Sequence, residues 1–203
     1  MESETETFTD PRDGKTYRTV KIGEQVWMAE NLNFECEGSV CYDNDPKNAK
    51  KYGRLYDWEA ANKACPPGWH LPSLKEWKDL EDFTQSYPIN GGKKLKAKSG
   101  WNDYKEKSGN GTDDYGFSAL PGGVSVNPND SFIWVGNCGL WWVALKKNKS
   151  STDIDYTWII KSSNHIRGLH WFPKAGVSRC FSVRCIQDKD KVSQKNSKCR
   201  RKK

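Results

Sequence analysis

Seven cysteines constrain the fold of this chain more than any other feature of its sequence. They stand at Cys36, Cys41, Cys65, Cys138, Cys180, Cys185 and Cys199. None belongs to a Cys-x-x-Cys pair, which argues against a zinc site and against a thioredoxin-like redox centre. The first six lie in the body of the chain, and an even number favours a set of disulfides made in an oxidising compartment.

An oxidising compartment requires export, yet residues 1–10 contain no apolar segment of the kind that signal peptides have. We therefore expect an exported protein, extracellular or in the cell envelope, whose export signal has been removed. The alternative is an intracellular protein with free thiols. No apolar run approaches the roughly 20 residues of a membrane-spanning helix, so we expect no transmembrane segment in the chain.

The net charge of +7 is concentrated at one end of the chain. Residues 187–203 contain eight Lys or Arg and two Asp, which accounts for +6 of it. Such a polar, charged segment cannot bury enough apolar surface to fold, so we expect a disordered basic tail there. Residues 1–9 are similarly expected to form a disordered acidic tail, which leaves a domain at residues 10–186. The charge of that body is nearly balanced, so we expect no nucleic-acid partner.

Local signals predict a hairpin and a first helix. Apolar residues flank Gly23-Glu24, and glycine as the first residue of a two-residue loop is typical of a type II′ hairpin. Asp57 is suited to cap a short helix within residues 56–65. The prolines and the glycine of "CPPGWHLP" then force a turn.

A second helix begins at Ser73, which forms a capping box with Glu76. Its apolar residues recur at every third position, and we expect them to share one buried stripe. They are Leu74, Trp77, Leu80 and Phe83. Residues 88–131 suit loops and brief strands, and apolar segments within residues 132–186 suit a closing set of strands. Two helices between a hairpin and C-terminal strands predict an α+β fold.

Six segments carry a family resemblance, and they follow one another as "DGKTYRTVKIGEQVWMAENLN", "YDND", "KYGRLYDW", "CPPGWHLPSLKEW", "NGTDDYGFSALPGG" and "FSVRC". In this order they resemble the Fibrobacter succinogenes major paralogous domain family, from about residue 10 to residue 186. That family occurs in exported or lipid-anchored bacterial surface proteins, and its biochemical role is poorly defined. The resemblance therefore implies a secreted protein or a lipoprotein at the cell surface.

A shorter stretch, "HLPSLKEW", is similar to the "RLPT-x-x-EW" stretch of formylglycine-generating enzyme-like domains. Those domains have a variant of the C-type-lectin-like fold. The resemblance implies such a fold here, with two helices that flank small antiparallel sheets and a large irregular loop region.

The same resemblance implies a disulfide pairing, although six cysteines allow fifteen connectivities. It joins Cys65 to Cys185 and Cys138 to Cys180; Cys36 with Cys41 completes the set, and Cys199 stays free in the tail. The first bridge would close a loop of about 120 residues, which entropy models credit with roughly 4 to 5 kcal/mol of stability.

Two short patterns suggest chemistry, but each has a stronger structural explanation. Cys180 and Cys185 are separated like the catalytic copper cysteines of formylglycine-generating enzymes, which would indicate a copper-dependent thiol oxidase. "FSVRC", however, resembles the terminal strand motif of the fold, so a structural disulfide is favoured. Trp101-Asn102-Asp103 spells the "WND" of calcium-dependent lectins, but it stands too far upstream and has no partner motif, so we interpret it as coincidence.

Metal and cofactor signals are weak. Oxygen atoms within residues 110–114 suit calcium, although turn formation explains these residues better. The histidines His70, His165 and His170 have no i, i+4 companion, and structural packing is expected for His70. We therefore expect no metal, no cofactor and no enzyme activity.

Aromatic residues gather in the last third of the chain. Core packing should account for most of them, but Trp141 and Trp142 are adjacent, so one of the two is expected to point outward. An outward Trp beside Asn and Asp loops suits a sugar ring. The candidate ligand-binding residues are Trp134, Trp141, Trp142, Trp158, Trp171, Asn127, Asn129 and Asp130.

These observations predict a non-enzymatic surface module that binds a plant or bacterial polysaccharide through aromatic-rich loops, with the site between residues 122 and 175. The alternatives are a protein-binding module for adhesion or envelope assembly and, more remotely, the copper-dependent thiol oxidase. The sequence leaves the oligomeric state open.

Overall fold

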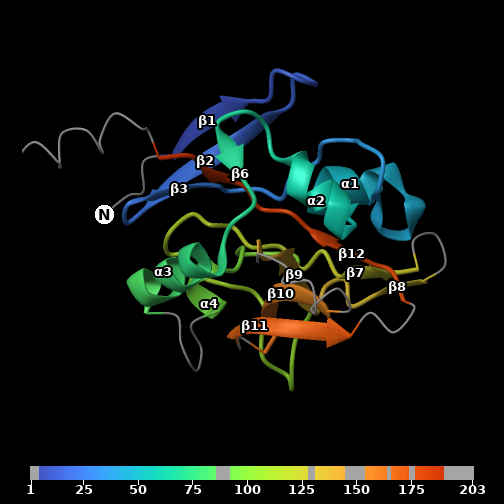
Figure 1. Ribbon diagram of the computed structural model, residues 1–203. Helices are drawn as coiled ribbons and strands as arrows, with labels where there is room; N and C mark the ends of the chain where they lie inside the picture. The colour runs from blue at the N-terminus through green and yellow to red at the C-terminus, as the bar shows by residue number, and fades with distance from the viewer. Residues whose placement is uncertain are drawn as a thin grey trace, which may run out of the picture.

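The structure, a computed structural model, describes residues 5–85, 92–127, 131–144, 154–163, 166–173 and 177–189. The described chain is a mixed α+β fold built on two β-sheets, which confirms the predicted α+β class (Figure 1). The C-terminal segment, red in Figure 1, runs from one sheet to the other. None of the helices in the described part of the chain is both long and apolar enough to cross a membrane.

The N-terminal sheet contains five described strands in the order β1-β2-β3-β13-β6. The bounds are β1 Thr5–Thr9, β2 Thr16–Ile22, β3 Gln25–Met28, β13 Ile186–Gln187 and β6 Trp69–His70. The second sheet follows the order β11-β10-β9-β12-β5-β4, and β7 joins it by pairing with β12 and β8. The bounds are β4 Ser39–Val40, β5 Leu55–Tyr56, β7 Val124–Val126, β8 Ser131–Ile133, β9 Cys138–Trp142, β10 Ile154–Lys161, β11 Ile166–Pro173 and β12 Arg179–Ser182.

The helices are short. Their bounds are η1 Tyr42–Asn44, α1 Pro46–Tyr52, α2 Trp58–Ala64, α3 Leu74–Thr84 and α4 Gly92–Leu95. In Figure 1, α1 and α2 lie on one side of the molecule and α3 and α4 on the other. The two predicted helices correspond to α2 and α3.

Strand β1 lies where the sequence predicts a disordered acidic tail. Residues 5–9 pair antiparallel with β2, from Thr5↔Val20 to Thr9↔Thr16. Phe8 supplies the apolar contact, because its ring packs 5.1 Å from that of Trp69 in β6. Residues 1–4 and 190–203, the rest of the two predicted tails, lie outside the described residues.

The predicted local signals for turns and caps are confirmed. Ile22 pairs with Gln25 across the two-residue loop, and Gly23 has a φ of 60°, as a type II′ turn requires. The side chain of Asp57 accepts a hydrogen bond from the N–H of Ala60 at 2.8 Å, which caps α2. At the start of α3, both hydrogen bonds of the predicted capping box are present.

The predicted buried stripe of α3 holds only in its middle. Trp77 and Leu80 are buried, but 54% of Phe83 is exposed. Each step of three residues falls about 60° short of a full turn, so Phe83 points about 180° away from Leu74. Phe83 instead packs against the β2–β3 turn, where a Cβ at Gly23 would lie 3.0 Å from its ring.

The two adjacent tryptophans of β9 are both buried, which corrects the prediction that one points outward. Strand β9 lies between β10 and β12, and both faces of the sheet are covered. On one face Trp141 lies 6.1 Å from the ring of Trp77 in α3. On the other face Trp142 packs against Trp58 of α2 at 5.2 Å and against Phe181 at 4.8 Å.

One predicted disulfide, Cys65–Cys185, is present, with 5.9 Å between the Cα atoms. Cys65 ends α2, and Cys185 lies between β12 and β13, where the chain leaves the second sheet and enters the N-terminal sheet. The bond therefore ties a helix to the segment that connects the two sheets.

The second predicted disulfide, Cys138–Cys180, is not formed, and the strand register gives the reason. Ser182 of β12 lies level with Trp141 of β9, so Cys180 is one residue out of register with Cys138. Neighbouring positions on a strand project to opposite faces, so the two side chains point away from each other.

The third predicted disulfide, Cys36–Cys41, is not formed either. Ser39 closes the turn at Cys36, because its N–H and its hydroxyl donate to the Cys36 carbonyl at 3.0 and 2.6 Å. The extended strand β4 then carries Cys41 away from Cys36.

Candidate functional site

Of the predicted ligand-binding tryptophans whose side chains the structure describes, only Trp134 lies at the surface. It follows β8, and 44% of the residue is exposed. Its carbonyl accepts hydrogen bonds from the N–H groups of Asn137 and Cys138 at 3.0 and 2.9 Å, so a tight turn fixes its backbone. Its φ is 69°, a left-handed conformation that costs a non-glycine residue on the order of 1 to 3 kcal/mol. The fold thus holds a large apolar ring outward at a cost in stability.

Phe172 of β11 supports the Trp134 ring from the side, with 6.5 Å between the ring centroids. Phe172 in turn stacks on Phe181 of the core at 5.5 Å. The Arg179 guanidinium lies over the Phe172 ring at 5.4 Å, and the His170 ring meets Phe172 edge-on at 4.8 Å. These contacts connect the exposed ring to the rigid sheet.

Asn127, another predicted ligand residue, lies at the opposite end of the β7–β8 hairpin from Trp134, because Val126 pairs with Ser131 and Val124 with Ile133. It is exposed, and it is bonded in both directions to Ser178, the neighbour of Arg179. Its N–H donates to the Ser178 carbonyl at 2.7 Å, and its Oδ1 accepts from the Ser178 N–H at 3.2 Å. We call the set of Trp134, His170, Phe172 and Arg179, which are joined by ring contacts, the Trp134 surface.

The other predicted tryptophans do not reach this surface. Trp141 donates its indole N–H to Oδ1 of Asn31 at 2.8 Å, and Trp142 donates to the carbonyl of Tyr56 at 2.7 Å. Trp158 is stacked on Trp77 at 5.6 Å. All three are buried, so the prediction that they bind ligand is wrong.

The remaining predicted ligand residues cannot be placed as side chains. The backbone of Trp171 pairs with Tyr156 in β11, but its side chain lies outside the described part of the structure. Asn129 and Asp130 also lie outside the described residues.

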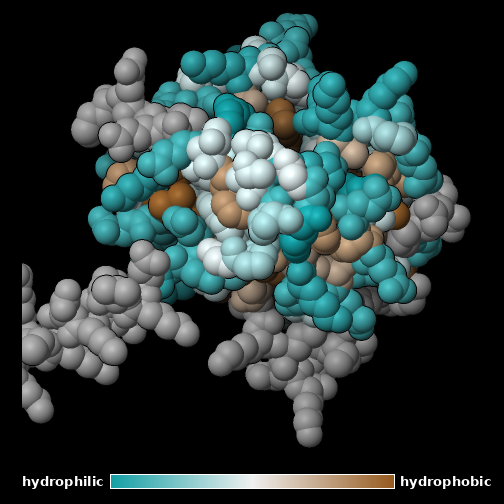
Figure 2. Space-filling model, turned by 90° about the horizontal axis from the view of Figure 1, so that it is seen from above, coloured by the Kyte–Doolittle hydropathy of each residue, from teal (hydrophilic) through white to brown (hydrophobic). Residues whose placement is uncertain are grey.

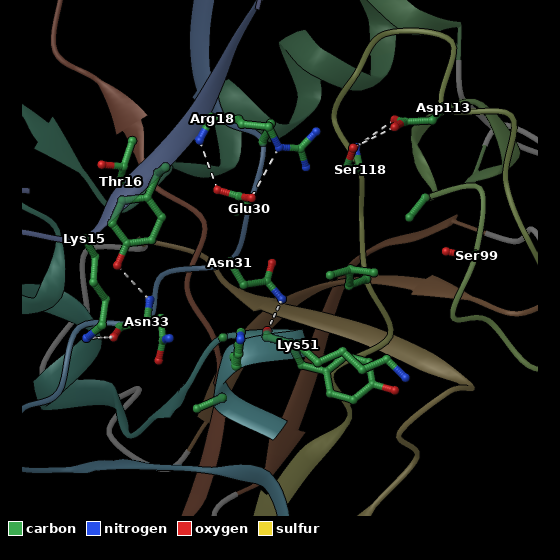
Figure 3. Close-up of a pocket in the computed structure, with 18 of the residues that line it drawn as sticks. Lys15, Thr16, Arg18, Glu30, Asn31, Asn33, Lys51, Ser99, Asp113 and Ser118 are labelled. Carbon is green, nitrogen blue, oxygen red and sulfur yellow. Dashed lines mark hydrogen bonds and ion pairs between the residues drawn. The ribbon is translucent and has the colours of Figure 1, made fainter. Parts of the chain in front are cut away.

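A pocket that the sequence does not reveal lies on another part of the molecule (Figure 3). Its volume is about 520 Å³, and strand β2, residues 29–33, helix α1 and the loop at 97–120 line it. Five of the lining side chains are basic and two are acidic, and we call it the basic pocket. The basic residues are Lys15, Arg18, Lys50, Lys51 and Lys98, and the acidic residues are Glu30 and Asp113.

Both acidic side chains of the basic pocket are already engaged. Glu30 accepts from the backbone N–H of Arg18 at 3.0 Å and from its Nε at 3.2 Å. Asp113 accepts from the N–H and the hydroxyl of Ser118 at 2.7 and 2.6 Å. Figure 3 shows these contacts on two sides of the pocket.

Behind the pocket wall lies Arg184, which is fully buried. Its guanidinium donates to Oδ1 of Asn31 and to the carbonyls of Met28, Phe117 and Ser118. Burial lowers its pKa to about 9, since the charged form is desolvated. The "FSVRC" motif contains this arginine, but a sequence pattern does not show that a strand-end cation will be buried.

His70 lies outside both regions, between two carboxylates. Its Nδ1 is 2.6 Å from Asp188 and its Nε2 is 2.9 Å from Glu76 of the capping box. The hydrogen bond with Glu76, joined by that with Asp188, raises the pKa of His70 against the opposing effect of burial. The residue links β6, α3 and the chain after β13, which supports the predicted structural role.

The two sequence patterns with metal-binding precedents are used for structure. Trp101 is buried, and its indole donates to the Ala119 carbonyl at 2.9 Å. Asn110 accepts from the N–H of Trp101 at 3.0 Å. Among the described residues, no group of three or more His, Cys, Asp or Glu side chains is arranged to hold a metal ion. Cys185 is bonded to Cys65, so it supplies no thiol to pair with Cys180 in an oxidase site.

Fold and surfaces together define an α+β domain that is tied by a disulfide and presents an aromatic surface and a basic pocket. The chain belongs to the Fibrobacter succinogenes major domain family, whose model matches residues 20–187. The resemblance in the sequence is therefore confirmed. No curated protein and no solved structure matches the chain. The Trp134 surface lies within the matched range, whereas Lys15 and Arg18 of the basic pocket precede it.

Proposed function

We propose that this protein is a non-enzymatic surface module that binds a glycan, with a saccharide ring stacked on Trp134. The observation that carries the proposal is the exposure of Trp134 in a left-handed backbone conformation. Strained residues persist where the surrounding structure enforces them, and they cluster at ligand-binding sites. A role in the core does not explain this tryptophan, since 44% of the residue is exposed.

The neighbours of Trp134 suit a sugar. Phe172 extends the apolar surface, and Arg179 brings a polar group to its edge. A flat ring takes the apolar face of a saccharide, while short polar groups bind its hydroxyls. Tryptophan and arginine are also the residues that most often dominate binding free energy at interfaces.

The proposal includes a C-type-lectin-like fold and an exported location. The Cys65–Cys185 bond supports both, because it joins the first-helix region to the last strands and because disulfides persist in oxidising compartments. Figure 2 supports a surface exposed to water, since apolar side chains occur on that face only as small separate patches.

A glycan array of plant and bacterial polysaccharides tests the proposal, with wild type and Trp134→Ala compared. Phe83→Ala is the matched control, because Phe83 is another exposed aromatic residue, on helix α3. We expect Trp134→Ala to lose at least tenfold in affinity, or about 1.4 kcal/mol, and Phe83→Ala to bind as wild type. Silence of the wild type across the array would contradict sugar binding.

A second candidate is protein recognition for adhesion or envelope assembly, and the position of β11 favours it. β11 is the last strand in the order of the second sheet, so its outer edge pairs with no described strand. Such an edge can accept a strand from a partner. Capture of an envelope protein in stoichiometric amount would favour this alternative over the first. Saccharides should not displace that protein, and Leu169→Lys in β11 should abolish its binding.

A further inference from the structure

The basic pocket has a charge that the described chain does not neutralise. Its five basic and two acidic lining residues give a net charge of +3, which becomes +2 when Asp13, the ion-pair partner of Lys15 outside the lining, is counted. Lys15 pairs with Asp13 at 2.8 Å, and Arg18 pairs with Glu30. Lys50 and Lys98 make no ion pair within the described residues. Lys51 also makes no ion pair within the described residues; its ammonium lies over the Tyr52 ring, 4.7 Å from the centroid.

A buried cation, Arg184, adds to the positive potential of the pocket from behind its wall. The guanidinium of Arg184 reaches two residues of the pocket wall, Asn31 at 2.7 Å and Ser118 at 3.5 Å. Every acceptor of Arg184 is neutral, and no described carboxylate forms an ion pair with it. A charge held in a low-dielectric interior acts over a longer range than one in water. The pocket therefore faces cations on its rim and a cation behind its wall.

We propose that the basic pocket binds an oxyanion, namely the carboxylate, phosphate or sulfate group of a small ligand. Lysine ammonium groups at the rim supply the charge-assisted donors that such groups prefer. Ser99 lines the same space, and its hydroxyl suits a neighbouring polar group of a ligand. A volume of about 520 Å³ fits a small molecule or one or two units of a chain.

This inference is independent of the glycan proposal, because no residue of the Trp134 surface lines the basic pocket. The arrangement also differs from that of a nucleic-acid-binding surface, because the positive groups surround a pocket and do not form a stripe along the surface. A bound anion would offset the positive charges of Lys51, Lys98 and Arg184, which form no ion pairs with any described residue.

Calorimetric titration tests the inference with inorganic phosphate, sulfate and glucuronate as separate ligands. Glucose is the neutral control, and sodium chloride is matched in ionic strength, because non-specific ion binding is screened by salt. We expect saturable binding of at least one anion. A preference for glucuronate would identify a carboxylate as the group that the pocket binds. A preference for phosphate or sulfate would identify a phosphate or sulfate ester. Each of these results supports the inference.

Lys51→Gln with Lys98→Gln is the test variant, since both side chains are exposed and their loss should not unfold the chain. We expect it to weaken anion binding at least tenfold. Lys63→Gln with Lys75→Gln, which removes two charges outside the pocket, should bind within twofold of wild type, and so should Trp134→Ala. Absence of binding beyond that of chloride, unchanged binding by the test variant, or loss in Trp134→Ala would overturn the inference.

Discussion

Arg184 donates two hydrogen bonds to Oδ1 of Asn31, from Nη2 at 2.7 Å and from Nε at 3.1 Å. The same oxygen accepts the indole N–H of Trp141 at 2.8 Å. The amide group of Asn31 donates to the Tyr52 carbonyl at 2.8 Å. One buried side chain thus joins the segment between the sheets, the central strand β9 and helix α1.

Asn31→Ala should be strongly destabilising for this reason. It leaves the Arg184 guanidinium and the Trp141 indole with buried unpaired donors, and an unsatisfied buried donor costs about 1 to 3 kcal/mol, more when it is charged. Chemical denaturation measures the change in the free energy of unfolding. Asn33→Ala is the control, because the side chain of Asn33 lies at the edge of the pocket, and a change within about 0.5 kcal/mol is expected there. A loss below about 1 kcal/mol for Asn31→Ala would show that Asn31 is not the link.

Lys96 should make the protein more stable in mild alkali. The residue is fully buried, and its Nζ donates to the Ser162 carbonyl at 3.0 Å. Burial, with the nearby charge of Lys93, lowers the pKa of Lys96 to about 8 from 10.5. Between these values the unfolded state binds more protons than the folded state, so stability rises with pH, by up to about 3 kcal/mol.

Lys96→Met separates this effect from other titrations. The difference in unfolding free energy between wild type and variant should shift in favour of wild type as the pH rises from about 8 to 10.5. Urea denaturation at several pH values measures it. A difference that stays constant over that range would mean that Lys96 keeps its ordinary pKa in the folded protein.

The contacts of His70 with Glu76 and Asp188, which we call the His70 bridge, should stabilise the fold mainly in weak acid. Because folding raises the pKa of His70, its contribution to stability is complete below pH 6.5 and is lost as the pH rises through the pKa of the folded state. Burial opposes ionisation of Glu76, but hydrogen bonds from His70 and Ser73 outweigh it and lower its pKa to about 2. The Glu76 contribution is present above 4.5 and is lost as the pH falls toward 2. The two overlap between pH 4.5 and 6.5.

His70→Gln should therefore lower the melting temperature more at pH 5.5 than at pH 8.5. The bridge is partly exposed, so solvent screening limits the effect to about 1 kcal/mol or less. Thermal unfolding followed by circular dichroism gives both values. An equal loss at the two pH values would indicate a packing role for the ring without a contribution from its charge.

Cys65→Ser should cost about 2 to 5 kcal/mol, as removal of a native disulfide generally does. Cys36→Ser, at a thiol that forms no disulfide in the structure, is the control and should change stability little. Peptide mapping without reduction should find the peptides of Cys65 and Cys185 linked. Detection of a linked Cys138–Cys180 pair would contradict the register of β9 and β12.

The features that the sequence predicted correctly depend on residues close together in the chain. The hairpin at Gly23 and the capping box of Ser73 and Glu76 are both set within a few positions. The features that it missed depend on what packs against an element. Trp141 and Trp142 are both buried because α3 and α2 cover opposite faces of one sheet, and no spacing in the sequence shows this.

The same reason explains the two candidate sites. Trp134 was found because exposed aromatic residues were expected in its region, but three of its predicted partners turned out to be core residues. The basic pocket was missed because it is lined by segments as far apart as Lys15 and Leu120. Nearly balanced charge over the whole body of the chain concealed a local excess that only the fold brings together.

Stacking of a saccharide on Trp134 is tested most directly by finding which tryptophan contacts the ligand. Indole N–H resonances are recorded by nuclear magnetic resonance while the saccharide selected by the array is added, and Trp134→Phe assigns the signal of Trp134. We expect the Trp134 resonance to shift until the site is saturated, while the resonances of the buried Trp27, Trp77 and Trp142 stay in place. An unchanged Trp134 resonance at saturating saccharide would contradict it.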